Sequence, residues 1–102
     1  MFRMTQSMVT NENSKRFEVM SFEVLNQQYQ LNYVKTEEEV AQDSVDIERL
    51  TDSIEAKGLS YFYASYDEKD VLEAFKEEPA VNINHYRLIE LSDNGLCLAI
   101  LN

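Results

Sequence analysis

Few side chains in this chain of 102 residues could support nucleophilic or metal chemistry. His85 is the only histidine, and no Gly-x-Ser-x-Gly motif or comparable nucleophile context accompanies it. Its strand-like surroundings favour a structural or surface histidine over a catalytic one. Cys97, the only cysteine, lies in the apolar run LCLAILN, so we expect a buried and unreactive thiol. A single cysteine excludes an internal disulfide and a zinc site built from several cysteines.

Carboxylates are numerous, but their spacing predicts no site for catalysis or for a metal ion. Glu37, Glu38 and Glu39 form a continuous run, unlike the spaced Asp, Asn, Gly and Glu of a calcium-binding loop. No carboxylate pair is singled out as a general acid and base. Gly58 and Gly95 are the only glycines, which is too few for a phosphate-binding loop. We therefore expect no catalytic residue, no metal site, no cofactor and no enzymatic activity.

The distribution of charge is more informative than any motif. The chain has a net charge of −10, and residues 36–78 contain fourteen of its nineteen carboxylates but only four of its nine cations. That segment therefore accounts for the whole net charge, and the remainder is neutral. Such a field repels nucleic acid and anionic membranes, so neither is expected as a direct partner. A basic protein surface is the partner that it would attract.

The elements that position these carboxylates begin with a helix in residues 36–58. Ile47, Leu50 and Ile54 recur at spacings of three and four, which places them on one helical face. Gly58 is suited to end the helix in a left-handed conformation.

The start of this helix has two interpretations. Thr36 and Glu39 form a capping box, which predicts a helix that begins there. Asp43, however, falls on the apolar face. The favoured alternative is a short first turn that breaks near Gln42 and a second helix that restarts with Asp43 or Ser44 as its cap.

The remaining pattern predicts a second helix and five strands. Residues 15–35 are predicted to form a hairpin with a turn at residues 26–28. The apolar phase changes near Ser21, which indicates a bulge there or a first strand covered on both faces at its far end. Residues 59–66 and 96–101 are apolar in both phases, which is typical of strands inside a sheet or covered by a partner. Further strand character lies in residues 80–91, before the turn Ser92-Asp93-Asn94-Gly95. The second helix follows Asp67 as its cap and ends before Pro79.

Together these elements predict an α+β fold in the order β-β-α-β-α-β-β. We expect a two-layer sandwich in which two helices cover one face of a mostly antiparallel five-stranded sheet. Residues 15–102 would form a single domain, and residues 1–14 a flexible tail. The uncovered face would be closed by the tail, by curvature or by a second copy, which predicts a homodimer. The chain lacks a long apolar run, a signal peptide and paired cysteines, which favours a cytoplasmic location.

The acidic helices and a group of tyrosines form the predicted interaction surface. Glu48, Asp52 and Glu55 form a stripe along the first helix. The ordinary alternative for this stripe is a solvated face without a partner. Tyrosines are favoured at the centre of interfaces, and their ordinary alternative is packing in the core. The predicted partner-binding residues are Glu37, Glu38, Asp46, Glu48, Asp52, Glu55, Tyr61, Tyr63, Tyr66, Glu73 and Glu77.

These features lead to one functional hypothesis and two alternatives. The first is an interaction module that docks its acidic helices on a basic surface, such as that of a nucleic-acid-binding protein, and blocks it. Inhibitors from phages and mobile elements that mimic nucleic acid offer an analogy of charge and size only. The alternatives are a structural or regulatory homodimer and a domain that binds or converts a small molecule.

Overall fold

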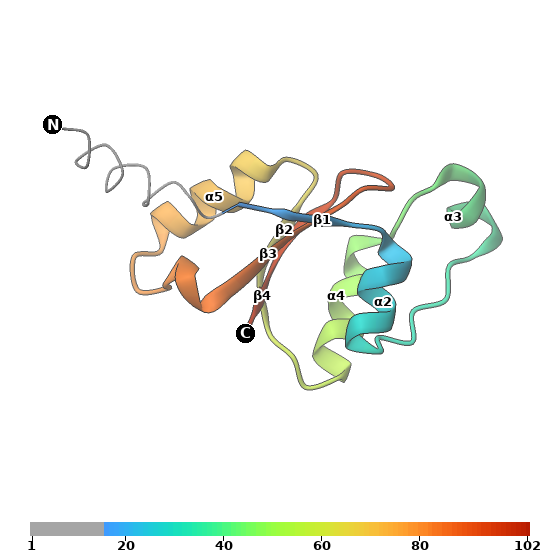
Figure 1. The fold of residues 1–102 in the computed structure, drawn as a ribbon, viewed down its shortest axis with the longest axis horizontal. Helices are drawn as coiled ribbons and strands as arrows, with labels where there is room; N and C mark the ends of the chain where they lie inside the picture. The colour runs from blue at the N-terminus through green and yellow to red at the C-terminus, as the bar shows by residue number, and fades with distance from the viewer. Residues whose placement is uncertain (1–15) are drawn as a thin grey trace, which may run out of the picture.

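The computed structural model describes residues 16–102, so the predicted tail of residues 1–14 lies outside the described residues. Four α helices, one 3-10 turn and four strands follow one another in the described part (Figure 1). In chain order they are β1 (Glu18–Met20), α2 (Phe22–Tyr29), α3 (Glu37–Gln42), α4 (Ile47–Ala56), β2 (Tyr61–Ser65), α5 (Glu68–Glu77), the 3-10 turn η1 (Ile83–His85), β3 (Tyr86–Leu91) and β4 (Cys97–Leu101).

The four strands form one mixed sheet in the order β1-β3-β4-β2. β1 runs parallel to β3, whereas β3 pairs with β4 and β4 with β2 in antiparallel fashion. The α+β class is thus confirmed, but the predicted five strands and the predicted element order were wrong. The hairpin turn between β3 and β4 was predicted correctly, and Gly95 adopts a positive φ of 80° there.

Helices cover both faces of the sheet, so the predicted two-layer arrangement with two helices on one face was wrong. Figure 1 shows α2 and α4 on one side of the strands and α5 on the other. Successive residues of a strand point to opposite faces, and β4 therefore contributes to two separate cores. Leu98 and Ile100 pack in the core with α2 and α4, whereas Cys97 and Ala99 pack in the core with α5. The prediction that β4 is central and apolar on both faces is confirmed.

The predicted hairpin of residues 15–35 is replaced by a short strand and a helix. The change in apolar phase near Ser21 marks the boundary between β1 and α2, because the Ser21 side chain accepts a hydrogen bond from the Val24 amide and caps the helix. Phe22 and Leu25, three residues apart, are buried against the sheet. Residues 31–36 have no regular secondary structure, and Asn32 adopts a positive φ of 61° among them.

The favoured break in the central helix is confirmed, but the restart lies later than predicted. Asp43 takes a left-handed conformation with φ 54° and ends α3. Asp46, not Asp43 or Ser44, caps α4 by accepting hydrogen bonds from the amides of Glu48 and Arg49. The Thr36 and Glu39 capping box is present at the start of α3. Gly58 follows α4 with φ 79°, as expected.

The predicted strands on either side of α5 are shorter than expected or differently placed. β2 lies at an edge of the described sheet and not inside it, although helices cover both of its faces. Residues 80–85 form a turn and the η1 element, and only residues 86–91 form a strand. The cap of α5 by Asp67 is confirmed, since its side chain accepts a hydrogen bond from the Lys69 amide.

None of the described helices has the length and the apolar character that crossing a membrane requires.

Candidate functional site

The acidic stripe of α4 lies on the surface, as its helical phase predicted. Leu50 and Ile54 are fully buried, and Glu48, Asp52 and Glu55 are exposed. The side chain of Thr51 is buried and donates back to the carbonyl oxygens of Ile47 and Glu48. The stripe is therefore available to a partner along the whole length of α4.

The other acidic helices do not extend this stripe into one continuous face. Glu73 and Glu77 are exposed on α5, which covers the opposite face of the sheet from α4. Glu37 and Glu38 are exposed in the first turn of α3. The assumption that the two long acidic helices lie side by side was therefore wrong, and the negative charge flanks the sheet on both sides.

Most carboxylates of residues 36–78 form no ion pair within the described part of the chain. Glu39 pairs with Arg49 at 2.8 Å, and Asp43 pairs with Lys35 at 3.7 Å. The other ion pair among residues 16–102 joins Arg87 and Glu18, outside this segment. Each of the three helices therefore keeps exposed carboxylates that are not engaged in ion pairs within the described part of the chain.

Glu39 differs from the other carboxylates because it holds the fold together. Its Oε1 accepts from the Thr36 amide at 2.9 Å and from Arg49 at 2.8 Å, and its Oε2 accepts from the Tyr33 hydroxyl at 2.8 Å. These donors, the Thr36 amide foremost, lower the pKa of Glu39 to about 2. Arg49 also lies 4.3 Å from the centre of the Tyr33 ring. Glu39 thus joins α3 to α4 and is not available to a partner.

The three predicted tyrosines of β2 and its flank have different environments. Tyr61 is half-buried and packs in the core with α4, as an ordinary core residue does. Tyr63 is 41% exposed, and Tyr66 is 52% exposed. The Tyr66 hydroxyl donates to the Val45 carbonyl at 2.9 Å, next to Asp46. Tyr63 of β2 and Tyr66, which follows the strand, are therefore the two exposed tyrosines of this group.

Two helix caps and one further carboxylate place three aspartates near the end of β2, where Tyr66 follows the strand. Asp46 caps α4 and Asp67 caps α5, and each uses its Oδ1 for the cap bonds. Asp70 accepts from the Ser65 hydroxyl through its Oδ2 at 3.0 Å. All three aspartates are exposed. The end of β2 near Tyr66 is therefore an acidic site with an aromatic surface, of which the sequence predicted Asp46 and the tyrosines but missed Asp67 and Asp70.

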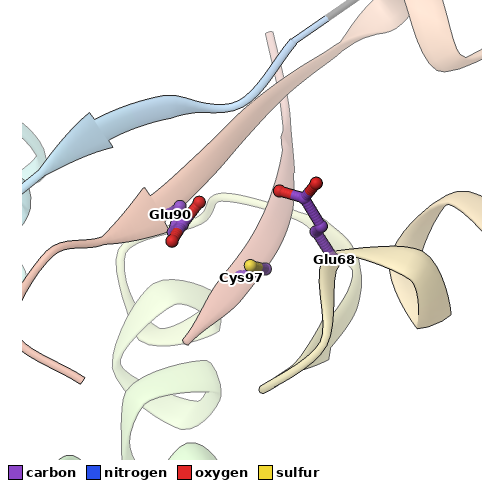
Figure 2. A group of neighbouring side chains, drawn as sticks. All are labelled: Glu68, Glu90 and Cys97. Carbon is purple, nitrogen blue, oxygen red and sulfur yellow. The ribbon is translucent and has the colours of Figure 1, made fainter. Parts of the chain in front are cut away.

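A second cluster, which the sequence did not predict, joins Glu68, Glu90 and Cys97. One ligand atom from each residue lies within 4.8 Å of the other two. Figure 2 shows that the three side chains come from α5, β3 and β4, so only the tertiary structure brings them together. Burial, followed by the charges of Glu90, Glu68 and Asp67, raises the pKa of the Cys97 thiol to about 12.

This cluster does not activate the thiol. Cys97 is buried, and its Sγ donates to the Gly95 carbonyl at 3.4 Å. Nucleophilic chemistry requires the thiolate, which neighbouring carboxylates and burial disfavour. The prediction of a buried thiol is confirmed, and its raised pKa agrees with low reactivity.

A shallow groove of about 560 Å³ lies beside α2 and the segment that leads into α3. Its lining includes Phe22, Asn26, Tyr33, Lys35 and Asp93. Asn26 bonds to the backbone of Tyr33, and Asp93 accepts from the Phe22 amide at 2.7 Å. These polar groups already serve the fold, which leaves few of them to orient a small ligand.

Comparisons with protein-family models, with curated proteins and with solved structures find no match to this chain.

Proposed function

We propose that this protein is an acidic interaction module that binds a basic surface of another protein and blocks that surface. The observation that supports the proposal is the exposure of Glu37, Glu38, Glu48, Asp52, Glu55, Glu73 and Glu77, none of which has an ion pair within the described residues. Nucleic-acid-binding proteins carry the kind of basic patch that such a surface complements.

The mechanism would be electrostatic steering followed by occupancy. Charges of one sign on both sides of the sheet raise the rate at which a basic partner meets the protein. Raising the salt concentration from about 0.1 M to about 1 M shortens the Debye length from about 10 Å to about 3 Å, so association would slow markedly. Dissociation depends on short-range contacts and would change less.

A matched pair of charge reversals tests this proposal. Asp52→Lys on α4 and Glu23→Lys on α2 change the net charge equally, and both side chains are exposed on helices. Glu18 is unsuitable as a control because it accepts from Arg87. Basic proteins are captured from lysate at low salt, and their binding kinetics are then measured by surface plasmon resonance.

We expect Asp52→Lys to lower the association rate further than Glu23→Lys, and both effects to shrink at high salt. Equal effects of the two variants, or association that is indifferent to salt, would contradict binding through the acidic helices.

A further inference from the structure

β2 forms one edge of the described sheet. β2 is the last strand of the described sheet, and β4 pairs with one side of it only. An edge strand presents unpaired backbone N–H and C=O groups, to which an extended segment can pair. The opposite edge, β1, has only three residues, and Glu18 within it is engaged by Arg87. β2 is the longer edge, with five residues.

β2 lacks two of the features that usually protect an edge, charged side chains and proline. Its sequence, YFYAS, contains no lysine, no other charge and no proline. The register shift between Tyr61 and Tyr63 is the one irregularity in its pairing with β4. Tyr63, which is 41% exposed, adds an aromatic surface to this edge.

The charges around β2 indicate what kind of strand would fit. Tyr61 and Ala64 pack toward α4, and Phe62 packs against Phe75 of α5 with ring centres 4.5 Å apart, so an acidic helix lies on each face of β2. Three exposed aspartates lie near the end of the strand: Asp70 accepts from Ser65, Asp67 follows Tyr66 in the chain, and Asp46 follows Val45, whose carbonyl accepts from Tyr66.

Lysine or arginine side chains suit this environment, because they pair with carboxylates and lie over aromatic rings. The Oδ2 atoms of Asp46 and Asp67 make no hydrogen bond among residues 16–102, so each cap retains an oxygen for a cation. A second copy of this chain would instead bring a like charge of −10 to the same edge.

We propose that β2 accepts an extended basic segment of the partner as an additional strand, with its cations against Tyr66, Asp46 and Asp67. This inference rests on the proposed function and specifies how the partner is held. Backbone pairing with β2 supplies short-range contacts, and the two acidic helices supply the attraction.

Synthetic peptides separate strand addition from attraction by charge alone. The first probe is an end-blocked peptide of alternating Lys and Val. The second has the same sequence and charge but carries N-methyl groups on its central residues, so it cannot donate backbone hydrogen bonds there. An alternating Glu and Val peptide is the charge control. Fluorescence anisotropy gives the affinity for the full chain, and amide hydrogen exchange followed by NMR reports on β2.

We expect the unmethylated basic peptide to bind at least about tenfold more tightly than the methylated one, since several backbone hydrogen bonds are lost. It should also slow exchange in Tyr61–Ser65, and the acidic peptide should not bind. Equal affinity of the two basic peptides would overturn strand addition while leaving charge-led docking intact. Failure of the unmethylated peptide to bind would also overturn strand addition. The proposed function is tested separately, by the plasmon-resonance experiment with the charge-reversal variants.

A pair of double variants locates the site on the protein. Asp46→Asn with Asp67→Asn removes two charges beside β2 but keeps both helix caps, because asparagine caps helices as well as aspartate does. Glu37→Gln with Glu38→Gln removes the same charge from α3. We expect the first pair to weaken binding of the basic peptide several-fold more than the second. Equal effects would place the peptide elsewhere on the acidic surface and overturn the assignment to β2.

Discussion

At the scale of single residues, Glu39 shows that the carboxylates of this protein have two separate roles. Its neighbours in the sequence, Glu37 and Glu38, are exposed in the first turn of α3, whereas Glu39 bonds to Thr36, Tyr33 and Arg49. The capping box predicted the bond to Thr36 from sequence alone. The bonds to Tyr33 and Arg49 could not be predicted, because they depend on how α3 packs beside α4.

We predict that Glu39 gives the fold a pH dependence in acid. The pKa of Glu39 in the folded chain is about 2, below its ordinary value of 4.5. The ionised carboxylate therefore stabilises the fold fully above pH 4.5, and this stabilisation is lost as the pH falls toward 2. Glu39→Gln should therefore lower the urea midpoint at neutral pH, and the difference from the wild type should close as the pH falls.

Glu37→Gln is the control for this prediction, because Glu37 occupies the same turn without the bonds to Tyr33 and Arg49. A difference between wild type and Glu39→Gln that stays constant from neutral to acid pH would contradict the assigned role of Glu39.

Cys97 illustrates the same limit at a second residue. Its burial followed from the apolar run around it, since β4 is apolar in both phases. Its proximity to Glu68 and Glu90 did not follow, because α5 and β3 reach it from elsewhere in the chain. The sequence can thus predict how buried a residue is more readily than which titratable groups surround it.

At the scale of elements, helices with a strong apolar period were predictable and short strands were not. α4 and α5 carry apolar residues at helical spacing and capping aspartates, and both exist close to the predicted places. α2 was missed because its sequence, FEVLNQQY, begins in the alternation of β1. The useful signal was Ser21 followed by Phe22 and Leu25, which fits a capped helix better than a bulged strand.

We predict that substitutions on the buried face of α4 lower the free energy of unfolding, whereas substitutions on its exposed face change it little. Ile54 is fully buried against the sheet, so Ile54→Ala should lower the free energy of unfolding by about 2–5 kcal/mol. Glu48, Asp52 and Glu55 are exposed, and changing each to lysine should alter it by no more than about 0.5 kcal/mol. Urea denaturation measures both effects. Unfolding of the triple lysine variant, or a loss below about 1 kcal/mol for Ile54→Ala, would contradict the orientation of α4.

At the scale of the whole molecule, the sequence predicted how much apolar surface needs cover but not which elements supply it. β4 was expected to be covered on both faces, and it is. Two predicted helices could not cover both faces of five strands, so the tail, curvature of the sheet or a second copy was expected to close the other face. The additional helix α2 and the shorter sheet remove that need, because α2 and α4 cover one face and α5 covers the other.

The distribution of charge differs from the expected single acidic face because α4 and α5 pack on opposite sides of the sheet. With helices on opposite faces, the carboxylates of α4 and α5 form two acidic surfaces with β2 between them. A partner that contacts both must do so across the edge of the sheet. Net charge per segment was readable from the sequence, but this arrangement depended on the side of the sheet to which each helix packs.

We predict that the chain is a monomer in solution, in place of the homodimer expected from an uncovered face. Both cores are closed by the chain's own helices, and two copies that meet at β2 would each bring acidic helices to the contact. Sedimentation equilibrium should give a mass of 11.9 kDa at low salt, where repulsion between copies with a net charge of −10 is strongest. A dimer at low salt would contradict the prediction, because an apolar contact would then outweigh the unscreened repulsion. In that case the exposed Tyr63 and Leu101 near the β2 edge would be the first residues to replace.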